Sequence, residues 1–237
     1  MKTVVYRIHY GFEAIYQSIE SIHSWADRIV VAVSKIPWYN EKTINYLGNV
    51  VEIVHPENID EEIEKLKKIP KVEVVIEEYK TQKRQWGYLI NKYASEYVLA
   101  MDADMIFPFE VEETDSILTW KQIEFWKNKN WRIPLRNRRG PVLYKNPSNI
   151  NTRFGALPTH GIYKVSNKLV HNIGLCYSEP LMLYKHLLAM GFSKPQYESI
   201  PNERWYVDKW LNWTPETENL GISLGDEHKI KRAIQVE

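Results

Sequence analysis

The sequence of 237 residues is poor in cysteine and glycine and has no long hydrophobic run. Its one cysteine, Cys176, excludes a disulfide scaffold and a zinc site built from cysteines, and it suits a reducing compartment. No stretch approaches the ~18 apolar residues that are needed to cross a bilayer. Residues 1–9 lack the apolar core of a secretory signal peptide. We therefore expect a cytoplasmic protein without a transmembrane segment.

Acidic residues are missing from the middle of the chain. Residues 125–178 contain no Asp or Glu, although the net charge of the whole chain is only +1. A basic stretch of this length favours an anionic ligand, and the plainer alternative is a solvated loop region. The basic residues of this stretch are Lys127, Lys129, Arg132, Arg136, Arg138, Arg139, Lys145, Arg153, Lys164 and Lys168.

The first hundred residues alternate between strand and helix patterns. Apolar residues at helical spacing predict helices over 13–25, over 60–69 with Asp60 as the cap, and over 81–93. Such alternation is typical of an α/β protein with a mainly parallel sheet flanked by helices. Short apolar or β-branched runs predict strands over residues 3–9, 28–33, 50–54, 72–76 and 97–101.

The pattern changes after Phe107. Residues 127–178 are rich in Asn, Pro, Arg and Gly and show little periodicity, so we predict an irregular part there. A helix is then predicted from Pro180 until Gly191 ends it. The chain is 44% hydrophobic and 26% charged, as one globular domain would be.

Several polar residues follow directly after predicted strands. Ligands of open α/β sheets bind at the carboxyl ends of the strands. The pattern therefore predicts one crevice that collects the residues at these ends, which are His9, Tyr10, Ser34, Lys35 and Asp102.

The clearest chemical signal is the pair Asp102 and Asp104, directly after the apolar run 97–101. Mg²⁺ and Mn²⁺ prefer oxygen ligands and often bind through one or two carboxylates and substrate phosphates. A D-x-D pair at a strand end is therefore suited to a metal that neutralises a diphosphate leaving group. An ordinary solvated turn is the plain alternative.

Two other enzyme classes also place an Asp after a strand. The chain has no G-x-x-x-x-G-K-[ST] loop, which a nucleotide-binding Walker B strand would require elsewhere in the sequence. Phosphatases of the haloacid dehalogenase type normally carry their D-x-D after the first strand, whereas Asp102 follows several strand–helix units. The D-x-D of this chain therefore favours a different reaction class.

Upstream segments give the D-x-D pair a family context. Residues 83–87 (Lys-Arg-Gln-Trp-Gly) open a helix that leads through 94–97 (Ala-Ser-Glu-Tyr) into the D-x-D strand. The order and spacing of these segments, with the opening strand–helix–strand of residues 4–31, resemble family 2-like glycosyltransferases of the GT-A fold. The resemblance covers residues 3–106. It implies a metal-dependent enzyme that transfers sugar from a nucleotide-diphosphate sugar to an acceptor hydroxyl.

The resemblance also implies roles for single residues. Asp104 would bind the Mn²⁺ or Mg²⁺ ion that bridges the two phosphates, and Asp102 would contact the ribose or the metal-bound water. Arg84 would lie near the nucleotide, and His9 and Tyr10 would line the base pocket. The second strand ends in Ser34 where the family commonly has an acid, which leaves the nucleotide base open.

A later histidine often supplies a third metal ligand in such enzymes. His171 follows a short apolar run and is the first candidate, ahead of His160. A transfer with inversion needs a carboxylate that deprotonates the acceptor hydroxyl. Glu179, the first acid after the basic stretch, is the candidate base, with Asp115 and Glu110 as rivals.

The basic stretch admits two interpretations. Arg136 and Arg138 would stabilise the departing diphosphate in one, and the whole stretch would bind an anionic glycan, a lipid-linked sugar or a DNA acceptor in the other. We expect one domain, with residues 1–106 as the nucleotide-sugar half and 107–237 as the acceptor half. A nucleotidyltransferase and a non-catalytic nucleic-acid or polyanion-binding protein remain alternatives.

Overall fold

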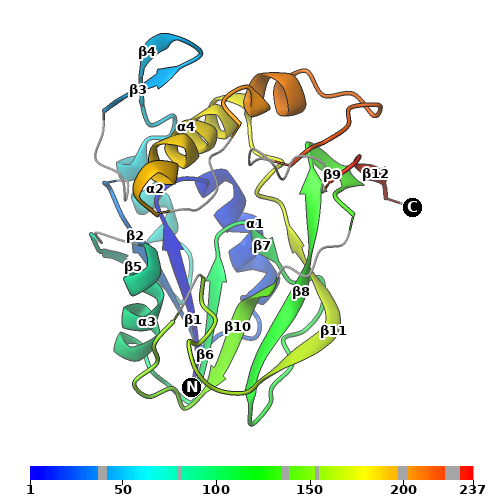
Figure 1. Ribbon diagram of the computed structural model, residues 1–237. Coiled ribbons are helices and arrows are strands. Elements are labelled where there is room, and N and C mark those ends of the chain that lie inside the picture. Colours follow the sequence, from blue (N-terminus) through cyan, green and yellow to red (C-terminus); the bar gives the residue numbers. More distant parts are fainter. Residues whose placement is uncertain are drawn as a thin grey trace.

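The computed structural model describes residues 1–36, 42–78, 82–134, 139–152, 155–196, 202–221 and 230–236, with only the backbone described at 82–84, 139 and 192–196. A 10-stranded mixed sheet with strand order β12-β9-β8-β10-β6-β1-β2-β5 forms its centre (Figure 1). Strand β11 joins this sheet beside β8, and β7 pairs with β11. The predicted α/β class, a sheet flanked by helices, is confirmed.

One half of the sheet is parallel. Strand β1 pairs with β2 on one side and with β6 on the other, and β5 extends the sheet beyond β2. Strands β1, β2 and β6 are almost entirely buried, because helices cover both faces of the sheet there, whereas the edge strand β5 is only partly buried. Their bounds are Lys2–Ile8 for β1, Arg28–Val33 for β2, Val72–Ile76 for β5 and Tyr97–Asp102 for β6.

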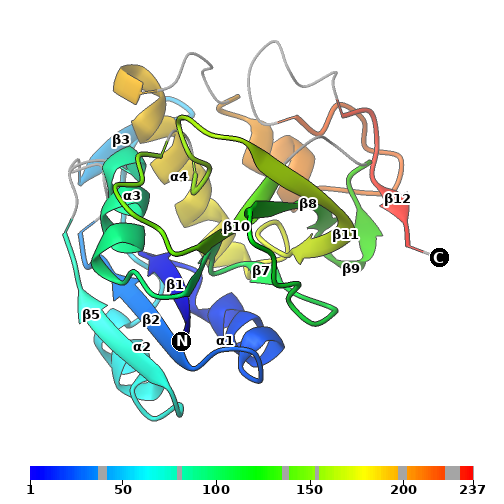
Figure 2. The same cartoon turned by 90° about the horizontal axis from the view of Figure 1, so that it is seen from below.

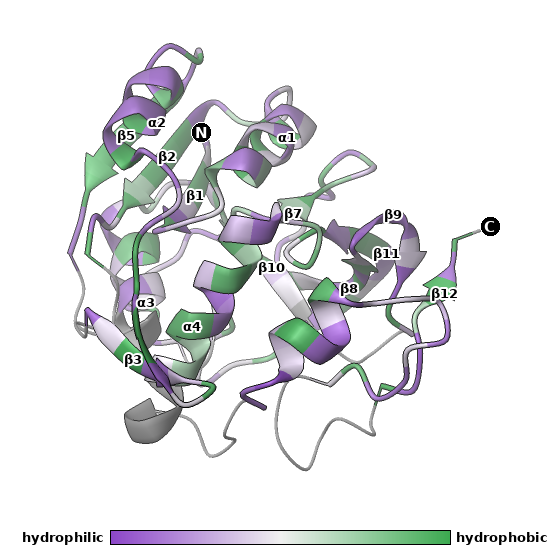
Figure 3. Cartoon of the chain, turned by 90° about the horizontal axis from the view of Figure 1, so that it is seen from above, coloured by the Kyte–Doolittle hydropathy of each residue, from purple (hydrophilic) through white to green (hydrophobic). Residues whose placement is uncertain are grey.

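Helices α1 (Phe12–Ile22) and α2 (Ile59–Leu66) cover one face of the parallel half, and α3 (Gln82–Lys92) covers the other (Figure 2). Successive residues of a strand point to opposite faces. Val4 accordingly packs in the cluster that contains α1 and α2 residues, and Val5 packs with Trp86 of α3. In Figure 3, much of α2 is hydrophilic whereas β2 is hydrophobic.

The other half of the sheet is mostly antiparallel. Strand β10 runs antiparallel to both β6 and β8, so the sheet continues from one half into the other. Strand β11 is parallel to β8 and antiparallel to the short β7. The bounds are Met105–Ile106 for β7, Ile117–Trp126 for β8, Asn128–Arg132 for β9, Arg139–Lys145 for β10, Tyr163–Asn172 for β11 and Ile234–Gln235 for β12.

Helix α4 (Glu179–Gln196) lies near the carboxyl end of β1, where Tyr184 contacts His9, and the π-helix η1 (Tyr206–Leu211) lies over the second half of the sheet (Figure 1). Residues of both helices share an aromatic-rich cluster with Phe125 and Trp126 of β8. This cluster packs α4 and η1 against the sheet. No helix in the described part of the chain is long and apolar enough to cross a membrane.

Three sequence-based expectations differ from the structure. Residues 50–54 do not join the main sheet, because β4 (Asn49–Glu52) forms a separate hairpin with β3 (Thr43–Tyr46), in which Val50 is 79% exposed. Asn58, not Asp60, caps α2 by accepting a bond from the Glu61 N–H. Helix α4 continues past Gly191, since packing offsets the cost of about 1 kcal/mol for one helical glycine.

The second half also contains more strand than its sequence indicates. Strands β9, β10 and β11 all fall within residues 127–178. Register shifts interrupt the ladders between β10 and β8 and between β11 and β8. Such irregularities break the two-residue periodicity by which strands are recognised in a sequence.

Candidate functional site

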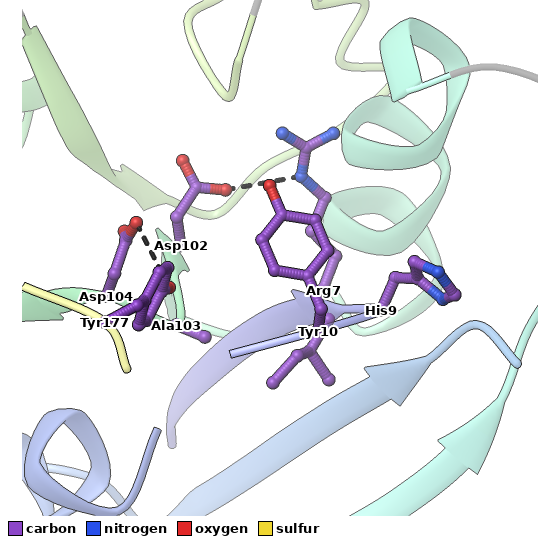
Figure 4. A pocket seen from close by; sticks show the side chains of 8 residues that line it. Arg7, His9, Tyr10, Asp102, Ala103, Asp104 and Tyr177 are labelled. Atoms are coloured by element: carbon purple, nitrogen blue, oxygen red, sulfur yellow. Dashed lines mark hydrogen bonds and ion pairs between the residues drawn. The ribbon is translucent and has the colours of Figure 1, made fainter. Parts of the chain in front are cut away.

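The ends of β1 and β6 form a pocket of about 170 Å³, which we call the aspartate pocket (Figure 4). Both strands are parallel, so their carboxyl ends meet at one edge of the sheet. This is the edge where the sequence predicts a ligand. The pocket is lined by Arg7, Ile8, His9, Tyr10, Asp102, Ala103, Asp104 and Tyr177.

Asp102 is paired with Arg7, its neighbour in the β1–β6 register. The Arg7 Nε atom lies 3.3 Å from Asp102 Oδ1, and the guanidinium group lies over the Trp86 ring at 4.9 Å. The Arg7 side chain is 8% exposed and that of Asp102 is 40% exposed. Asp102 also borders a smaller hollow of about 70 Å³ between Trp86 and Gly140. A buried, stacked arginine thus holds a carboxylate that remains open to a ligand.

Asp104 lies deeper, and its two oxygens differ. Oδ2 accepts a long hydrogen bond of 3.5 Å from the Tyr177 hydroxyl and lies 3.9 Å from Lys185 Nζ. Oδ1 is buried and has no hydrogen-bond partner in the described part of the chain. Burial raises the pKa of Asp104 and the neighbouring Asp102 raises it further, although Lys185 opposes the shift.

Gly174 makes the position of Asp104 possible. A Cβ atom at residue 174 would lie only 2.1 Å from Asp104 Oδ2 and 2.9 Å from Lys185 Nζ. The Gly174 carbonyl accepts a 2.6 Å hydrogen bond from Lys185, which fixes the ammonium group beside the carboxylate. Only glycine fits between these groups without displacing one of them.

The two carboxylates fit a divalent cation. A buried carboxylate oxygen without a partner is costly, and a bound cation would satisfy Asp104 Oδ1. Mg²⁺ and Mn²⁺ commonly take one or two protein carboxylates and fill their other positions with water and substrate phosphates. The described residues contain no group of three or more acidic, His or Cys side chains that would form a complete protein cage. The donor set therefore suits a cation that arrives with a phosphate ligand.

His9 forms part of the wall, and its ring nitrogens are both engaged. Nδ1 lies 2.8 Å from the Ser34 carbonyl oxygen, which can only accept, so Nδ1 carries the proton. Nε2 then accepts from the Tyr184 hydroxyl at 2.7 Å. Burial lowers the pKa of His9 to about 4, so the ring is neutral at pH 7. In Figure 4 the ring points away from Asp102 and Asp104.

Of the other residues predicted for the crevice, Tyr10 lines the aspartate pocket, whereas Ser34 and Lys35 do not, and Lys35 forms an ion pair with Asp60 instead. The Tyr10 side chain lies within the aspartate pocket, where burial and the two carboxylates raise the pKa of its hydroxyl. The Ser34 hydroxyl donates to the Ile36 carbonyl at 2.6 Å, and Ser34 is 1% exposed. Tyr10 is thus placed to contact a ligand, whereas Ser34 acts on the pocket through His9.

The structure does not bring the other predicted site residues into the aspartate pocket. Glu179 is exposed in the first turn of α4 and is not among the pocket residues. His171 lines a separate pocket beside Phe125. The Arg84 side chain is not described, and Arg136 and Arg138 lie outside the described residues.

Sequence reasoning missed Arg7, Tyr177 and Lys185. A signal was available for two of them. Arg7 is the one charged residue within the predicted strand 3–9, and a strand buried on both faces has no solvent side for it. Lys185 follows Leu181 at the four-residue spacing of a helix and occupies an apolar position of α4. No comparable signal marks Tyr177.

No protein-family model matches this sequence, and no curated protein matches it. The mannosyltransferase PcManGT from Pyrobaculum calidifontis, in complex with GDP-Man and Mn²⁺, is similar in structure with a TM-score of 0.42 and 10% identity over 81% of this chain. This chain spans 63% of that protein.

Two further solved structures have similar scores. HddC from Yersinia pseudotuberculosis, complexed with GMP-PN, gives a TM-score of 0.44 with 11% identity over 79% of this chain and 98% of its own. S. aureus TarS 1-349, in complex with UDP, gives 0.43 with 14% identity over 90% of this chain and 71% of its own. These similarities are too low to assign this chain to a family or to a reaction.

Proposed function

We propose that this protein is a metal-dependent glycosyltransferase that uses a nucleotide-diphosphate sugar. The observation that carries the proposal is the pair Asp102 and Asp104 at the shared end of two buried parallel strands, with one buried carboxylate oxygen lacking a partner. The order of sequence segments that leads into this pair, over residues 3–106, supports the same reaction class.

Asp104 and Asp102 would hold the cation, Mn²⁺ or Mg²⁺. When bound, it neutralises the negative charge that develops on the departing diphosphate. Lys185 and Tyr177 fix Asp104 from one side, and Arg7 fixes Asp102 from the other. The pocket therefore holds both acids in place before a ligand arrives, which lowers the cost of organising the site.

The remaining predicted residues keep proposed roles that depend on the ligand. Arg84 and one or both of Arg136 and Arg138 would contact the nucleotide or its diphosphate. His171 stays a candidate contact to a ligand but does not share a pocket with the aspartates. In the transfer, the bond from the sugar C1 to the diphosphate oxygen breaks, the acceptor oxygen bonds to C1, and a base takes the hydroxyl proton. Glu179, exposed at the start of α4, remains the candidate base.

Nucleotidyl transfer is the main alternative, and the start of α1 argues against it. Such enzymes usually bind phosphates on a glycine-rich loop after the first strand. Here the Glu57 carboxylate already accepts hydrogen bonds from the Gly11 N–H at 2.8 Å and the Glu13 N–H at 3.3 Å. An internal anion thus occupies the position where a phosphate would have to bind.

The structure also argues against the hypothesis that the basic stretch binds a polyanion. Lys145 forms an ion pair with Asp115, and Lys168 lies 3.1 Å from Glu112. Lys127 packs over the Trp210 ring at 3.6 Å. The acids that pair with Lys145 and Lys168 lie outside residues 125–178. Folding therefore cancels part of the charge asymmetry of the sequence.

The product that is released distinguishes glycosyl transfer from nucleotidyl transfer. We expect incubation with nucleotide sugars and Mn²⁺ to release a nucleoside diphosphate, with water as a surrogate acceptor. Incubation with nucleoside triphosphates and sugar phosphates should release no pyrophosphate. The Asp104→Asn variant should lose the release, whereas Glu20→Gln, an exposed acid on α1, should keep it. Pyrophosphate release would instead support the nucleotidyl alternative.

A further inference from the structure

A second pocket, of about 400 Å³, shares none of its described lining residues with the aspartate pocket. We call it the basic pocket. It lies on the antiparallel half of the sheet, where β8, β9 and β11 run side by side. Its volume is within the range of small-molecule sites. The lining residues are Ile123, Phe125, Lys129, Arg132, Leu169, His171 and Val236.

The basic pocket combines an apolar surface with positive charge. Of the seven described residues that line it, four are apolar, two are Lys or Arg, and none is acidic. Lys129 donates a 3.0 Å hydrogen bond to the uncharged Gln17 side chain. Neither Lys129 nor Arg132 forms an ion pair with an acid in the described part of the chain, in contrast to Lys145 and Lys168 of the same basic stretch. Within the described residues, these two cations are therefore not neutralised.

His171 adds a polar group to this wall. Its ring meets the Phe125 ring edge-on, with 5.0 Å between centroids. Burial and the charge of Lys129 lower the pKa of His171, so the imidazole is neutral at pH 7 and can donate one N–H. The alternation along β8 turns Gln122 and Glu124 to the opposite side from Ile123 and Phe125. The acid of this strand therefore does not offset the cations.

We propose that the basic pocket binds an organic anion with an apolar body, in which the phosphate or carboxylate lies against Lys129 and Arg132 and the apolar part against Ile123, Phe125 and Leu169. An apolar ligand alone would leave the two cations desolvated and unpaired. A small inorganic anion alone would leave the apolar wall uncovered. The combination satisfies both parts of the pocket. This inference does not depend on the transferase proposal, because the two pockets share none of their described lining residues.

Octyl phosphate, used below its micelle concentration in calorimetry, is a suitable probe. We expect it to bind the full chain about tenfold more tightly than octanol or inorganic phosphate, since each of these offers only half of the chemistry. Lys129→Ala and Arg132→Ala should each weaken the binding of octyl phosphate about fivefold. Lys68→Ala removes an exposed charge just after α2, outside the pocket, and should change nothing. Circular dichroism and melting curves check that each variant folds.

Three results would overturn the proposal. The first is unchanged octyl phosphate affinity in a folded Lys129→Ala/Arg132→Ala double variant. The second is a loss in Lys68→Ala equal to that in Arg132→Ala, which would indicate unspecific charge attraction. The third is cosedimentation with phosphatidic acid vesicles without any binding of octyl phosphate, which would indicate a membrane surface instead of a pocket. Asp104→Asn should bind octyl phosphate normally. A failure of the transferase proposal therefore leaves the proposal for the basic pocket unaffected, and the reverse also holds.

Discussion

The aspartate pocket and the basic pocket belong to one sheet but are built in different ways. The first lies at the ends of parallel strands, where β1 and β6 are almost entirely buried and bring Arg7, Asp102 and the following Asp104 to one edge. The second lies on one face of the strands β8, β9 and β11, where side chains of all three strands form the wall together with Val236. Strand ends thus present a few fixed polar groups, and strand faces present an extended mixed surface.

The two pockets also differ in how their charges are compensated. Each carboxylate of the aspartate pocket has a basic partner from a distant part of the sequence, Arg7 for Asp102 and Lys185 for Asp104. Lys129 and Arg132 of the basic pocket have no acidic partner within the described residues. A site whose carboxylates already have basic partners suits a ligand that carries its own cation, such as a metal-bound nucleotide. An unpaired cationic site suits a bare anion.

The largest expected effect concerns Asp104. We expect Asp104→Asn to reduce metal-dependent nucleoside diphosphate release by at least about 100-fold, because the buried oxygen that would bind the cation becomes neutral. The melting temperature should stay the same or rise, since a charge that burial disfavours is removed. A steady-state assay and a melting curve on the same sample measure both. Full activity in this variant would contradict the assignment of the aspartate pocket as the cation-binding site.

Gly174→Ala tests the aspartate pocket without changing any charged group. The added Cβ lies 2.1 Å from Asp104 Oδ2, so the carboxylate must move. We expect metal affinity to fall about 30-fold, as when groups that orient a metal ligand are disturbed. Stability should change little, because the atoms that must move are the ends of side chains. Titration with Mn²⁺ in the presence of a nucleoside diphosphate gives the affinity, and octyl phosphate binding serves as the control.

His9 gives a pH-dependent prediction for the wall of the aspartate pocket. Its folded-state pKa of about 4 lies below the ordinary value of 6.5, so its contribution to stability is present above pH 6.5 and is lost as the pH falls toward 4. Between pH 7 and pH 5 this loss amounts to about 2 kcal/mol. Urea unfolding at both pH values should show this difference between the wild type and His9→Gln.

Other groups also titrate in this range, so the comparison between the two proteins is the decisive quantity. Buried His186 also has a lowered pKa and contributes in the same direction. It does so equally in both proteins and therefore cancels. If wild type and His9→Gln lose the same free energy of unfolding between pH 7 and pH 5, His9 is not held neutral by the fold.

The smallest effect is expected for Arg7→Lys. Lysine keeps the charge but loses the flat contact with Trp86 and the Nε bond to Asp102. We expect nucleotide affinity to fall about tenfold, which corresponds to roughly 1.4 kcal/mol. Arg28→Lys is a matched control, because Arg28 also stacks on an aromatic ring, Tyr93, and bonds a carboxylate, Glu73, far from the pocket. Equal loss in both variants would assign the effect to general stability.

The parallel half of the fold was predictable from its sequence. The predicted strands 28–33 and 72–76 coincide with β2 and β5, because both are short runs rich in β-branched residues. The same logic was wrong for 50–54, since an exposed hairpin strand has a similar composition. Position in the sheet depends on tertiary contacts that a short run does not encode.

The sequence also placed part of the aspartate pocket. His9, Tyr10, Asp102 and Asp104 follow their strands, and the parallel topology brings them together. Tyr177 and Lys185 come from beyond residue 170, and no local pattern connects them with β6. His171 illustrates the converse. Its motif suggested a third metal ligand, but the register of β11 against β8 places it in the basic pocket.

The measurement that tests the central claim most directly is the melting temperature with a panel of nucleoside diphosphates and nucleotide sugars, with and without Mn²⁺. A ligand that binds only the folded state raises the melting temperature by mass action. The proposal predicts a rise that needs both Mn²⁺ and one nucleotide, that disappears in Asp104→Asn and that persists in Glu20→Gln. No rise in the folded wild type, or an equal rise in Asp104→Asn, would contradict it.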